Sequence, residues 1–275
     1  MRVVAALGGN ALLRRGEPVD PATQRDNVRR AARALAGIAR AHALVVTHGN
    51  GPQIGLLARA SPGASLDVLG AETEGMIGYW IERELRAQLP GREVATLLTQ
   101  VEVDGDDPAF AHPAKPIGTG DDRRRVASPE PRRILALAAI RLLVEAGVLV
   151  VCAGGGGIPV VATADGAARG VDAVIDKDLS SALLAEQLGA DALLLLTDAP
   201  AVFRDWPRPA RDAIGRATPR ELRALSFEAG SMAPKVEAAC RFVERTGGRA
   251  VIGALEDAER MLDGEAGTQV EAARA

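Results

Sequence analysis

Six short apolar runs, without the polar alternation of a half-exposed strand, constrain the fold of this chain more than any other feature. They cover residues 3–7, 43–47, 94–101, 148–152, 192–197 and 250–252. Runs of this length are typical of strands covered on both faces, as in a parallel sheet between helices. Helical patterns lie between the runs; in residues 24–41, for example, Val28, Ala31, Leu35 and Ile38 recur at helical spacing. The alternation predicts an α/β fold with a mainly parallel central sheet.

Four local signals predict where helices begin or end. Ser65 can cap a helix that runs towards Leu89, and Ser128-Pro129-Glu130 places a serine before a first-turn proline. Thr218-Pro219 with Glu221 forms a capping box, and a helix from Pro234 is expected to end at Gly247 and Gly248.

Composition excludes several classes of function. The 275 residues suffice for one large domain or two lobes, and 47% hydrophobic with 25% charged residues is ordinary for a soluble protein. Only 3% aromatic residues and a net charge of -3 argue against nucleic-acid binding. No apolar run approaches membrane-spanning length and no signal peptide precedes the first run. Two cysteines without a CxxC pair fit a reducing cytoplasm, and the three histidines have no metal-ligand spacing.

Only three of the 33 basic residues are lysines, namely Lys115, Lys177 and Lys235. Lysine is a compact charge on a flexible stem, suited to a phosphate that moves during a reaction. Lys177 lies between Asp176 and Asp178 at a predicted helix start, and Lys235 lies in the first turn of another helix. The helix dipole favours the acids and disfavours a lysine there, unless an anion sits in front of it.

Glycine clusters follow three of the predicted strands. They are Gly8-Gly9-Asn10, Gly49-Asn50-Gly51 and Gly154-Gly155-Gly156. Each cluster alone is explained by a tight turn. Three at the carboxyl edge of one parallel sheet favour a ligand site, where backbone N–H groups can approach an anion.

Other candidate features leave alternatives open. Asp198 directly follows the run 192–197. An aspartate there could orient lysines, bind a nucleotide hydroxyl or magnesium, or cap the following turn. No Walker A motif is present. Gly49, Gly51 and Gly55 loosely echo a dinucleotide-binding loop, which keeps a nicotinamide-dependent oxidoreductase as a rival, although Asp67 lies at a helix start instead of a strand end. Residues 104–127, which include Lys115, form a long irregular stretch of the kind that carries function.

Taken together, the motifs resemble those of the carbamate kinases of the amino acid kinase family. The matching stretches cover nearly the whole chain. They are residues 7–12 (LGGNAL), 47–53 (THGNGPQ), 67–79 (DVLGAETEGMIGY), 98–101 (LTQV), 115–118 (KPIG), 124–126 (RRV), 128–131 (SPEP), 152–160 (CAGGGGIPV), 174–178 (VIDKD) and 230–236 (GSMAPKV).

The resemblance implies a three-layer α/β/α sandwich that forms a homodimer in the cytoplasm. It implies reversible phosphoryl transfer between carbamoyl phosphate plus ADP and carbamate plus ATP, with Mg²⁺ accompanying the nucleotide, in arginine metabolism. The carbamoyl substrate is expected on an N-terminal lobe of residues 1–147, with a lid at about 104–127, and the nucleotide on a C-terminal lobe of residues 148–275.

We assign the glycine clusters to substrate, with the Asn10 and Asn50 amides helping the backbone of Gly8, Gly9, Gly49 and Gly51. Lys177 and Lys235 are assigned to the nucleotide phosphates and the migrating charge, with Asp198 also on the nucleotide. Asp176 is assigned to orienting the lysines. Lys115 is expected to reach the active site from the lid. Arg125 could assist phosphoryl transfer, but its place in a run of arginines favours a solvated charge.

Three departures from the family pattern stand out. The segment between Gly118 and Arg123 is much shorter than in typical carbamate kinases, Ala233 replaces a glycine, and Pro200 replaces an aspartate. The short lid predicts a milder effect of substituting Lys115 than of substituting the other two lysines. Two alternatives remain within this fold: a kinase for another small carboxylate, and a non-catalytic protein that binds carbamoyl phosphate or nucleotide.

Overall fold

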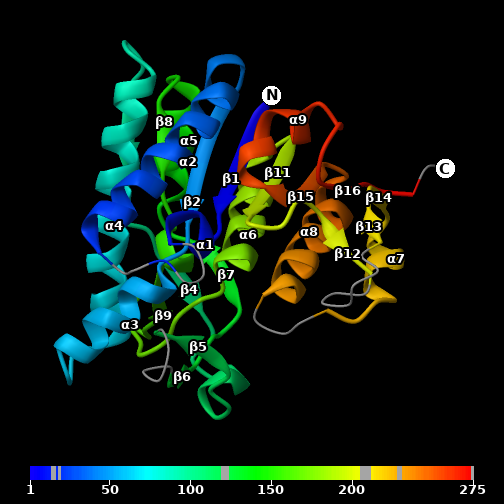
Figure 1. Cartoon of the computed structure of the whole chain (residues 1–275). Coiled ribbons are helices and arrows are strands. Elements are labelled where there is room, and N and C mark those ends of the chain that lie inside the picture. The colour runs from blue at the N-terminus through cyan, green and yellow to red at the C-terminus, as the bar shows by residue number, and fades with distance from the viewer. Residues whose placement is uncertain (14–16, 18–19, 119–123, 205–211, 228–230, 274–275) are drawn as a thin grey trace.

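The computed structural model describes the chain except residues 14–16, 18–19, 119–123, 205–211, 228–230 and 274–275, and except the side chains of Asn10, Ala11 and Pro21. An eight-stranded sheet forms the centre of the molecule (Figure 1). Its strand order is β14 (Arg216–Ala217), β16 (Thr268–Val270), β15 (Arg249–Ala254), β11 (Ala192–Thr197), β1 (Arg2–Leu7), β2 (Ala43–His48), β8 (Leu149–Val151) and β3 (Val94–Thr96). Only the β15–β16 pair is antiparallel among these neighbours.

Helices cover both faces of this sheet, which confirms the three-layer α/β/α sandwich. On β1, Val3, Ala5 and Leu7 pack on one face, together with α2 (Pro21–Ala41), α4 (Leu66–Gln88) and α9 (Ala258–Leu262). Val4 and Ala6 pack on the other face, with α5 (Leu137–Glu145), α6 (Lys177–Leu188) and α8 (Met232–Thr246). Because both faces are covered, the strands read as continuous apolar runs.

A second, smaller sheet lies beyond the carboxyl edge of the central one. Its order is β10 (Ala168–Gly170), β9 (Ile158–Ala162), β4 (Gln100–Val103) and β7 (Pro131–Ile134). Two strand pairs stand apart, β5 (Lys115–Ile117) with β6 (Arg124–Val126) and β12 (Val202–Phe203) with β13 (Ala213–Ile214). The remaining helices are α1 (Gly9–Leu12), α3 (Gly51–Ala60) and α7 (Pro219–Arg223). In Figure 1, β5 and β6 lie at the lower end of the molecule, near α3.

Most local predictions are confirmed. Five of the six apolar runs coincide with strands of the central sheet. The capping box of Thr218 and Glu221 is present with both of its hydrogen bonds, and α8 ends before Gly247, whose φ is 69°. Helix α4 begins after Ser65, but the Ser65 side chain does not cap it; Asp172 instead accepts the Leu66 N–H at 2.9 Å.

Two expectations are wrong. The run 94–101 is not one strand, because the chain leaves the central sheet after Thr96 and enters the second sheet at Gln100. Thr99 lies at this crossing and is held by the Glu74 carboxylate, which accepts its N–H at 3.2 Å. Ser128-Pro129-Glu130 does not open a helix either; it leads into β7, and Asp107 accepts the Glu130 N–H.

Among the helices in the described part of the chain, none is long and apolar enough to cross a membrane.

Candidate active site

The glycine segments after β1 and β2 meet at the carboxyl edge of the sheet, as the parallel register requires. Leu7 is paired with both His48 on β2 and Leu196 on β11. Gly8 donates to the Leu196 carbonyl at 2.9 Å, and Gly49 donates to the Leu7 carbonyl at 3.0 Å. A Cβ on Gly8 would lie 2.8 Å from the Leu196 oxygen. Gly8 and Gly49 are buried and use their N–H groups within the sheet. The next residues, Gly9 and Gly51, begin α1 and α3, and first-turn N–H groups have no acceptor within their own helix, which suits an anionic ligand at this edge.

The third glycine segment folds over the same edge in a left-handed conformation. Ala153, Gly155, Gly156 and Gly157 all have positive φ values, of 50°, 69°, 98° and 87°. Ala153 is the only non-glycine residue in the described chain with a positive φ. Gly156 and Gly157 donate to the carbonyls of Ala153 and Gly154, so the segment is a tight turn that is held internally. Strain at a non-glycine residue such as Ala153 is typical of functional sites.

Glu74 from α4 holds this third segment in place. Its carboxylate accepts the Gly154 N–H at 2.8 Å and the Thr99 N–H at 3.2 Å, while the Thr99 hydroxyl accepts the Ala153 N–H at 2.9 Å. Glu74 is 1% exposed. Burial raises its pKa to about 8, although the two backbone donors oppose this shift.

Asn50 and His48 lie beneath the same loop. The Asn50 amide nitrogen donates to the Thr73 hydroxyl at 2.9 Å, and a Cβ on Gly155 would lie 2.2 Å from that nitrogen. The His48 Nδ1 contacts the Gly49 carbonyl at 3.2 Å, its buried Nε2 has no hydrogen-bond partner, and burial lowers its pKa to about 4. The Asn50 side chain thus supports the loop, and its contact with substrate stays a prediction.

The three lysines converge on two aspartates at the start of α6. Asp178 lies between Lys177 and Lys235, with its carboxylate oxygens 2.7 Å and 3.0 Å from the two ammonium nitrogens. Asp176 caps α6 through the N–H groups of Asp178 and Leu179, and its other oxygen binds the Lys115 ammonium at 2.8 Å. The predicted lysine cluster therefore includes Asp178, which sequence reasoning left without a role.

Charge and burial set the electrostatics of this cluster. Lys177 and Asp178 are 8% and 4% exposed. Burial lowers the pKa of Lys177 against the attraction of Asp178. Burial would raise the pKa of Asp178, but the two lysines overcome it and hold the pKa well below its usual range. Burial opposes the charge of Lys235 too, yet Asp178 and more weakly Asp176 and Asp198 raise its pKa.

One ammonium group in the cluster has unused donor capacity. The Lys177 Nζ is buried and lies 2.7 Å from an Asp178 oxygen, its one ion-pair partner in the described part of the chain, whereas an ammonium group has three N–H donors. A buried donor without an acceptor is costly. The Lys177 protons are therefore available to another anion at this position.

Buried hydroxyls fix the first turn of α6 against β2. The Thr47 and Ser181 hydroxyl oxygens are 2.6 Å apart, and Ser181 donates to the Lys177 carbonyl at 2.6 Å. All three residues are buried. No sequence signal marked Thr47 or Ser181, since hydroxyl residues on buried helices and strand ends are common.

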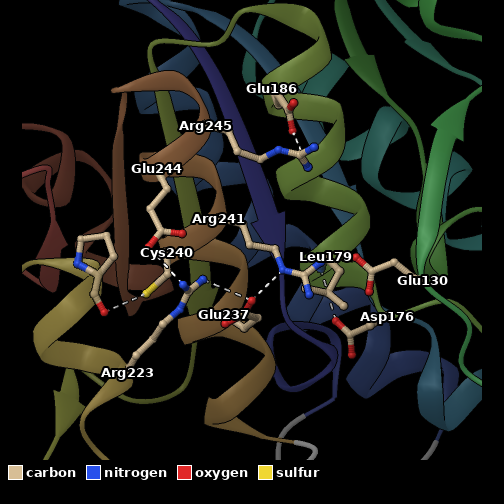
Figure 2. Close-up of polar contacts among 11 residues, drawn as sticks. Glu130, Asp176, Leu179, Glu186, Arg223, Glu237, Cys240, Arg241, Glu244 and Arg245 are labelled. Carbon is tan, nitrogen blue, oxygen red and sulfur yellow. Dashed lines mark hydrogen bonds and ion pairs between the residues drawn. The ribbon is translucent and has the colours of Figure 1, made fainter.

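Ion pairs hold α8, which carries Lys235, against its neighbours. Figure 2 shows Arg241 between Glu237 and Glu130, and Arg245 reaching Glu186 on α6. The Arg245–Glu186 distance is 3.1 Å. In the same view, Arg223 from α7 pairs with Glu237 and with Glu244. Arg245–Glu186 is the pair that links α8 to α6, whereas the others link α8 to α7 and to Glu130. Such exposed pairs are individually weak.

The remaining candidates have defined positions with one exception. Asp198 is exposed at the end of β11. Arg125 is exposed and its guanidinium lies 3.4 Å from the Ala114 carbonyl, in keeping with a solvated charge. The backbone of Gly9 and Asn10 begins α1, whereas the Asn10 side chain lies outside the described residues. Among the described residues, no three histidine, cysteine or acidic side chains group as a metal site.

Comparisons with known proteins agree with this geometry. The model of the amino acid kinase family matches residues 1–254. The carbamate kinase of Rhizobium meliloti is 52% identical over 300 aligned positions, which take in 98% of this chain and 92% of the relative. The carbamate kinase of Haemophilus influenzae is 49% identical, with 98% of this chain and 96% of the relative covered.

A solved structure is similar over the same extent. The carbamate kinase from Giardia lamblia bound to AMP-PNP superposes with a TM-score of 0.92 at 36% identity, and covers 99% of this chain and 98% of its own. The Rhizobium meliloti alignment has 300 positions against 275 residues here, so at least 25 positions of that relative have no counterpart.

Proposed function

The chain belongs to the amino acid kinase family, and within it to the carbamate kinases; from this premise we propose that it transfers a phosphoryl group between carbamoyl phosphate plus ADP and carbamate plus ATP. The observation that carries the proposal is the lysine cluster at the glycine-rich sheet edge. Three ammonium groups are gathered there around Asp176 and Asp178. An ammonium group has three N–H donors, so the lysines can donate to phosphate oxygens as well as to these carboxylates.

Phosphoryl transfer needs positioning and positive charge more than covalent help from the protein. In the reaction that forms ATP, a terminal phosphate oxygen of ADP attacks the phosphorus of carbamoyl phosphate. The bond between phosphorus and the carbamoyl oxygen breaks, and carbamate leaves with the electron pair. No proton moves, so the site requires no general base.

We assign each part of the site one task in this reaction. The backbone at Gly9 and Gly51 holds carbamoyl phosphate. Gly8 and Gly49, whose N–H groups bond to the neighbouring strands, position this backbone, and the third glycine segment closes over the substrate. Lys177 and Lys235 stabilise the equatorial oxygens as the phosphoryl group passes between donor and acceptor. Asp178 keeps both lysines charged and oriented, since it contacts both ammonium groups.

Magnesium enters this proposal with the nucleotide. Mg²⁺ prefers oxygen ligands and keeps several waters. Asp176 and Asp178 bind lysines. Asp198 accepts the Thr197 hydroxyl at 3.1 Å, is exposed at the end of β11, and raises the pKa of Lys235. We propose that Asp198 binds the nucleotide-associated Mg²⁺ directly or through water. When bound, the ion neutralises phosphate charge.

The division of labour between lobes is part of the same proposal. Residues 1–147 supply the first two glycine segments for carbamoyl phosphate. Residues 148–275 supply the third glycine segment, and Lys177, Asp198 and Lys235 for the nucleotide. The family resemblance further favours a cytoplasmic enzyme of arginine metabolism.

A homodimer is proposed on an exposed apolar stripe. Val68 and Tyr79 are 50% and 57% exposed and are spaced to share one face of α4. Leu98 is 56% exposed and extends this stripe, since its side chain lies 3.8 Å from where a Cβ on Gly75 would be. Sedimentation of the purified protein at micromolar concentration should give a dimer, and Tyr79→Glu should give monomers.

The proposed reaction is tested by mixing the purified protein with ADP, Mg²⁺ and carbamoyl phosphate and measuring ATP. ATP formation above the uncatalysed rate is expected. A wild-type protein that binds ADP but makes no ATP would refute the proposal and favour a binding protein. Activity with acetyl phosphate at a higher kcat/KM than with carbamoyl phosphate would favour a kinase for another small carboxylate.

A further inference from the structure

We infer that Lys115 is presented by a strand pair packed permanently against α3 and α4, so that Gly55, Gly118, Ile117 and Val126 act as positioning residues for it. The inference rests on the proposed phosphoryl transfer and explains how Lys115 is held in the active site. It concerns only the described parts of the strand pair, which are β5 with Gly118 and β6 with Ala127.

Two side chains anchor the strand pair in a core of its own. Ile117 and Val126 are 1% and 7% exposed. They pack with Ile54 of α3, Leu66 and Leu69 of α4, and Val174, in a cluster separate from the two main cores. Both side chains are removed from water only while the strand pair stays packed, so the hydrophobic effect favours the packed position. The strand pair is therefore held closely to the helices.

A contact between two glycines brings the backbones together. A Cβ on Gly55 would lie 2.2 Å from the Gly118 Cα and 2.4 Å from its nitrogen, so α3 and the end of β5 approach as closely as only glycine permits. Gly118 has a φ of 85° and donates to the Gly51 carbonyl at 3.3 Å. The strand pair is thus docked on the first turns of the helix that follows the second glycine segment.

The register of the strand pair places Lys115 directly beside the anchored residues. Lys115 is paired directly with Val126, and the next residue, Ala127, accepts the Val174 N–H at 2.9 Å. Two residues after Val174, Asp176 binds the Lys115 ammonium at 2.8 Å. Side chains directly opposite on antiparallel strands share one face, so the face anchored by Ile117 and Val126 is the face that bears Lys115.

This arrangement argues against the mild effect of Lys115 that the segment's length predicts. A short segment without anchors would hold its lysine loosely. Here both strands of the short segment, β5 and β6, are packed against α3 and α4. Lys115 therefore needs no closing movement to reach Asp176.

The test combines Gly55→Ala with Lys115→Ala, and uses Gly70→Ala as the matched control. Ordinary contact begins at 3.4 Å, so an alanine at position 55 forces β5 away by roughly 1 Å, a displacement that can cost about a hundredfold in rate. Gly70 is also a helical glycine, but a Cβ there meets nothing within 4 Å.

We expect Gly55→Ala and Lys115→Ala each to lower kcat/KM for carbamoyl phosphate by roughly a hundredfold. The double variant should be no worse than Lys115→Ala alone, because both changes remove the same lysine from the site. Gly70→Ala should keep the wild-type value. A wild-type rate for Gly55→Ala, or multiplicative losses in the double variant, would overturn the inference. If Gly55→Ala does not fold, Ile117→Ala takes its place with the same expectations.

A second measurement separates this inference from the proposed function. The rate at which acetic anhydride modifies the Lys115 amine, relative to the N-terminal amine, is followed by mass spectrometry. Gly55→Ala should raise this ratio severalfold and Gly70→Ala should leave it unchanged. An unchanged ratio in Gly55→Ala would refute the packed arrangement even if the wild-type protein makes ATP. A raised ratio would support it even if the wild-type protein makes none.

Discussion

Replacing Asp178 by asparagine tests the lysine cluster most directly, because it removes one charge and almost no volume. The carboxylate faces two ammonium groups at 2.7 Å and 3.0 Å, and the side chains of Asp178, Lys177 and Lys235 are 6%, 10% and 12% exposed. Breaking a buried ion pair costs about 3–5 kcal/mol, because the remaining charges lose their partner. For a chain of this size, that corresponds to a melting temperature lower by about 10 °C.

Urea unfolding of wild type and Asp178→Asn, each with and without Mg-ADP, measures this effect. We expect the loss in the free energy of unfolding to shrink when ADP is present, since its phosphates supply the missing negative charge. Glu102→Gln is the control: Glu102 pairs with Arg133, whose side chain is 63% exposed, so the change should cost less than about 1 kcal/mol. Equal losses in both variants would refute the argument that burial of the cluster sets the cost.

The same variant should lower turnover. Preorganised charges at the site of phosphoryl transfer are worth about 10²–10³-fold each in rate, and Asp178→Asn releases two of them at once. A folded Asp178→Asn protein with kcat within threefold of wild type would show that the lysines do not depend on this carboxylate.

Three further predictions concern the same edge of the sheet. Lys177→Arg and Lys235→Arg should each lower kcat by orders of magnitude while circular dichroism stays unchanged; near wild-type rates would remove the assigned roles. The free energy of unfolding should fall as the pH rises from 6.5 to 8. The folded Glu74 keeps its proton up to about pH 8, whereas the unfolded one loses it near 4.5. The opposite difference at His48, between about 4 and 6.5, acts mainly below this window and offsets less than about 0.5 kcal/mol of the fall within it. One proton over this window amounts to about 2 kcal/mol, and Glu74→Gln should abolish the slope in urea titrations at several pH values. Gly155→Ala should raise KM for carbamoyl phosphate at least tenfold, because its Cβ would lie 2.2 Å from the Asn50 amide and because φ is 69° there. Gly166→Ala, with φ of 81° and no neighbour within 4 Å, controls for the strained conformation alone.

Local and periodic signals were sufficient for the central sheet and for most helix ends. The strands at 3–7 and 192–197 are covered on both faces of the sheet. Their residues are therefore apolar without interruption, and this continuity is visible in the sequence alone. The capping box at Thr218 likewise involves atoms only three residues apart. Lys177 was also identified by a local argument, because a lysine in the first turn of a helix is disfavoured by the positive end of the helix dipole.

Features that depend on tertiary contacts could not be predicted this way. The break in 94–101 is made by Glu74, which is more than twenty residues away and holds Thr99 and Gly154 together. The expected helix at Ser128 yields to a strand because Pro131 and the residues after it pair with β4. A serine followed by proline fits either structure locally, so only the partner strand decides.

The division of roles between Asp176 and Asp178 shows where sequence reasoning stops and why. Both acids suit a helix start, and the sequence interpretation assigned the orienting of the lysines to Asp176 and no role to Asp178. In the structure, Asp176 is the N-cap and keeps one oxygen for its own helix, which leaves the other for Lys115. Asp178 is already within the first turn, where successive side chains point about 100° apart, and it faces inwards to meet Lys177 and Lys235. Asp176 uses one carboxylate oxygen to cap the helix. Asp178 does not cap the helix, so both of its carboxylate oxygens can bind lysines. We therefore expect Asp176→Asn to impair the Lys115 contact and the helix start, and Asp178→Asn to impair phosphoryl transfer itself.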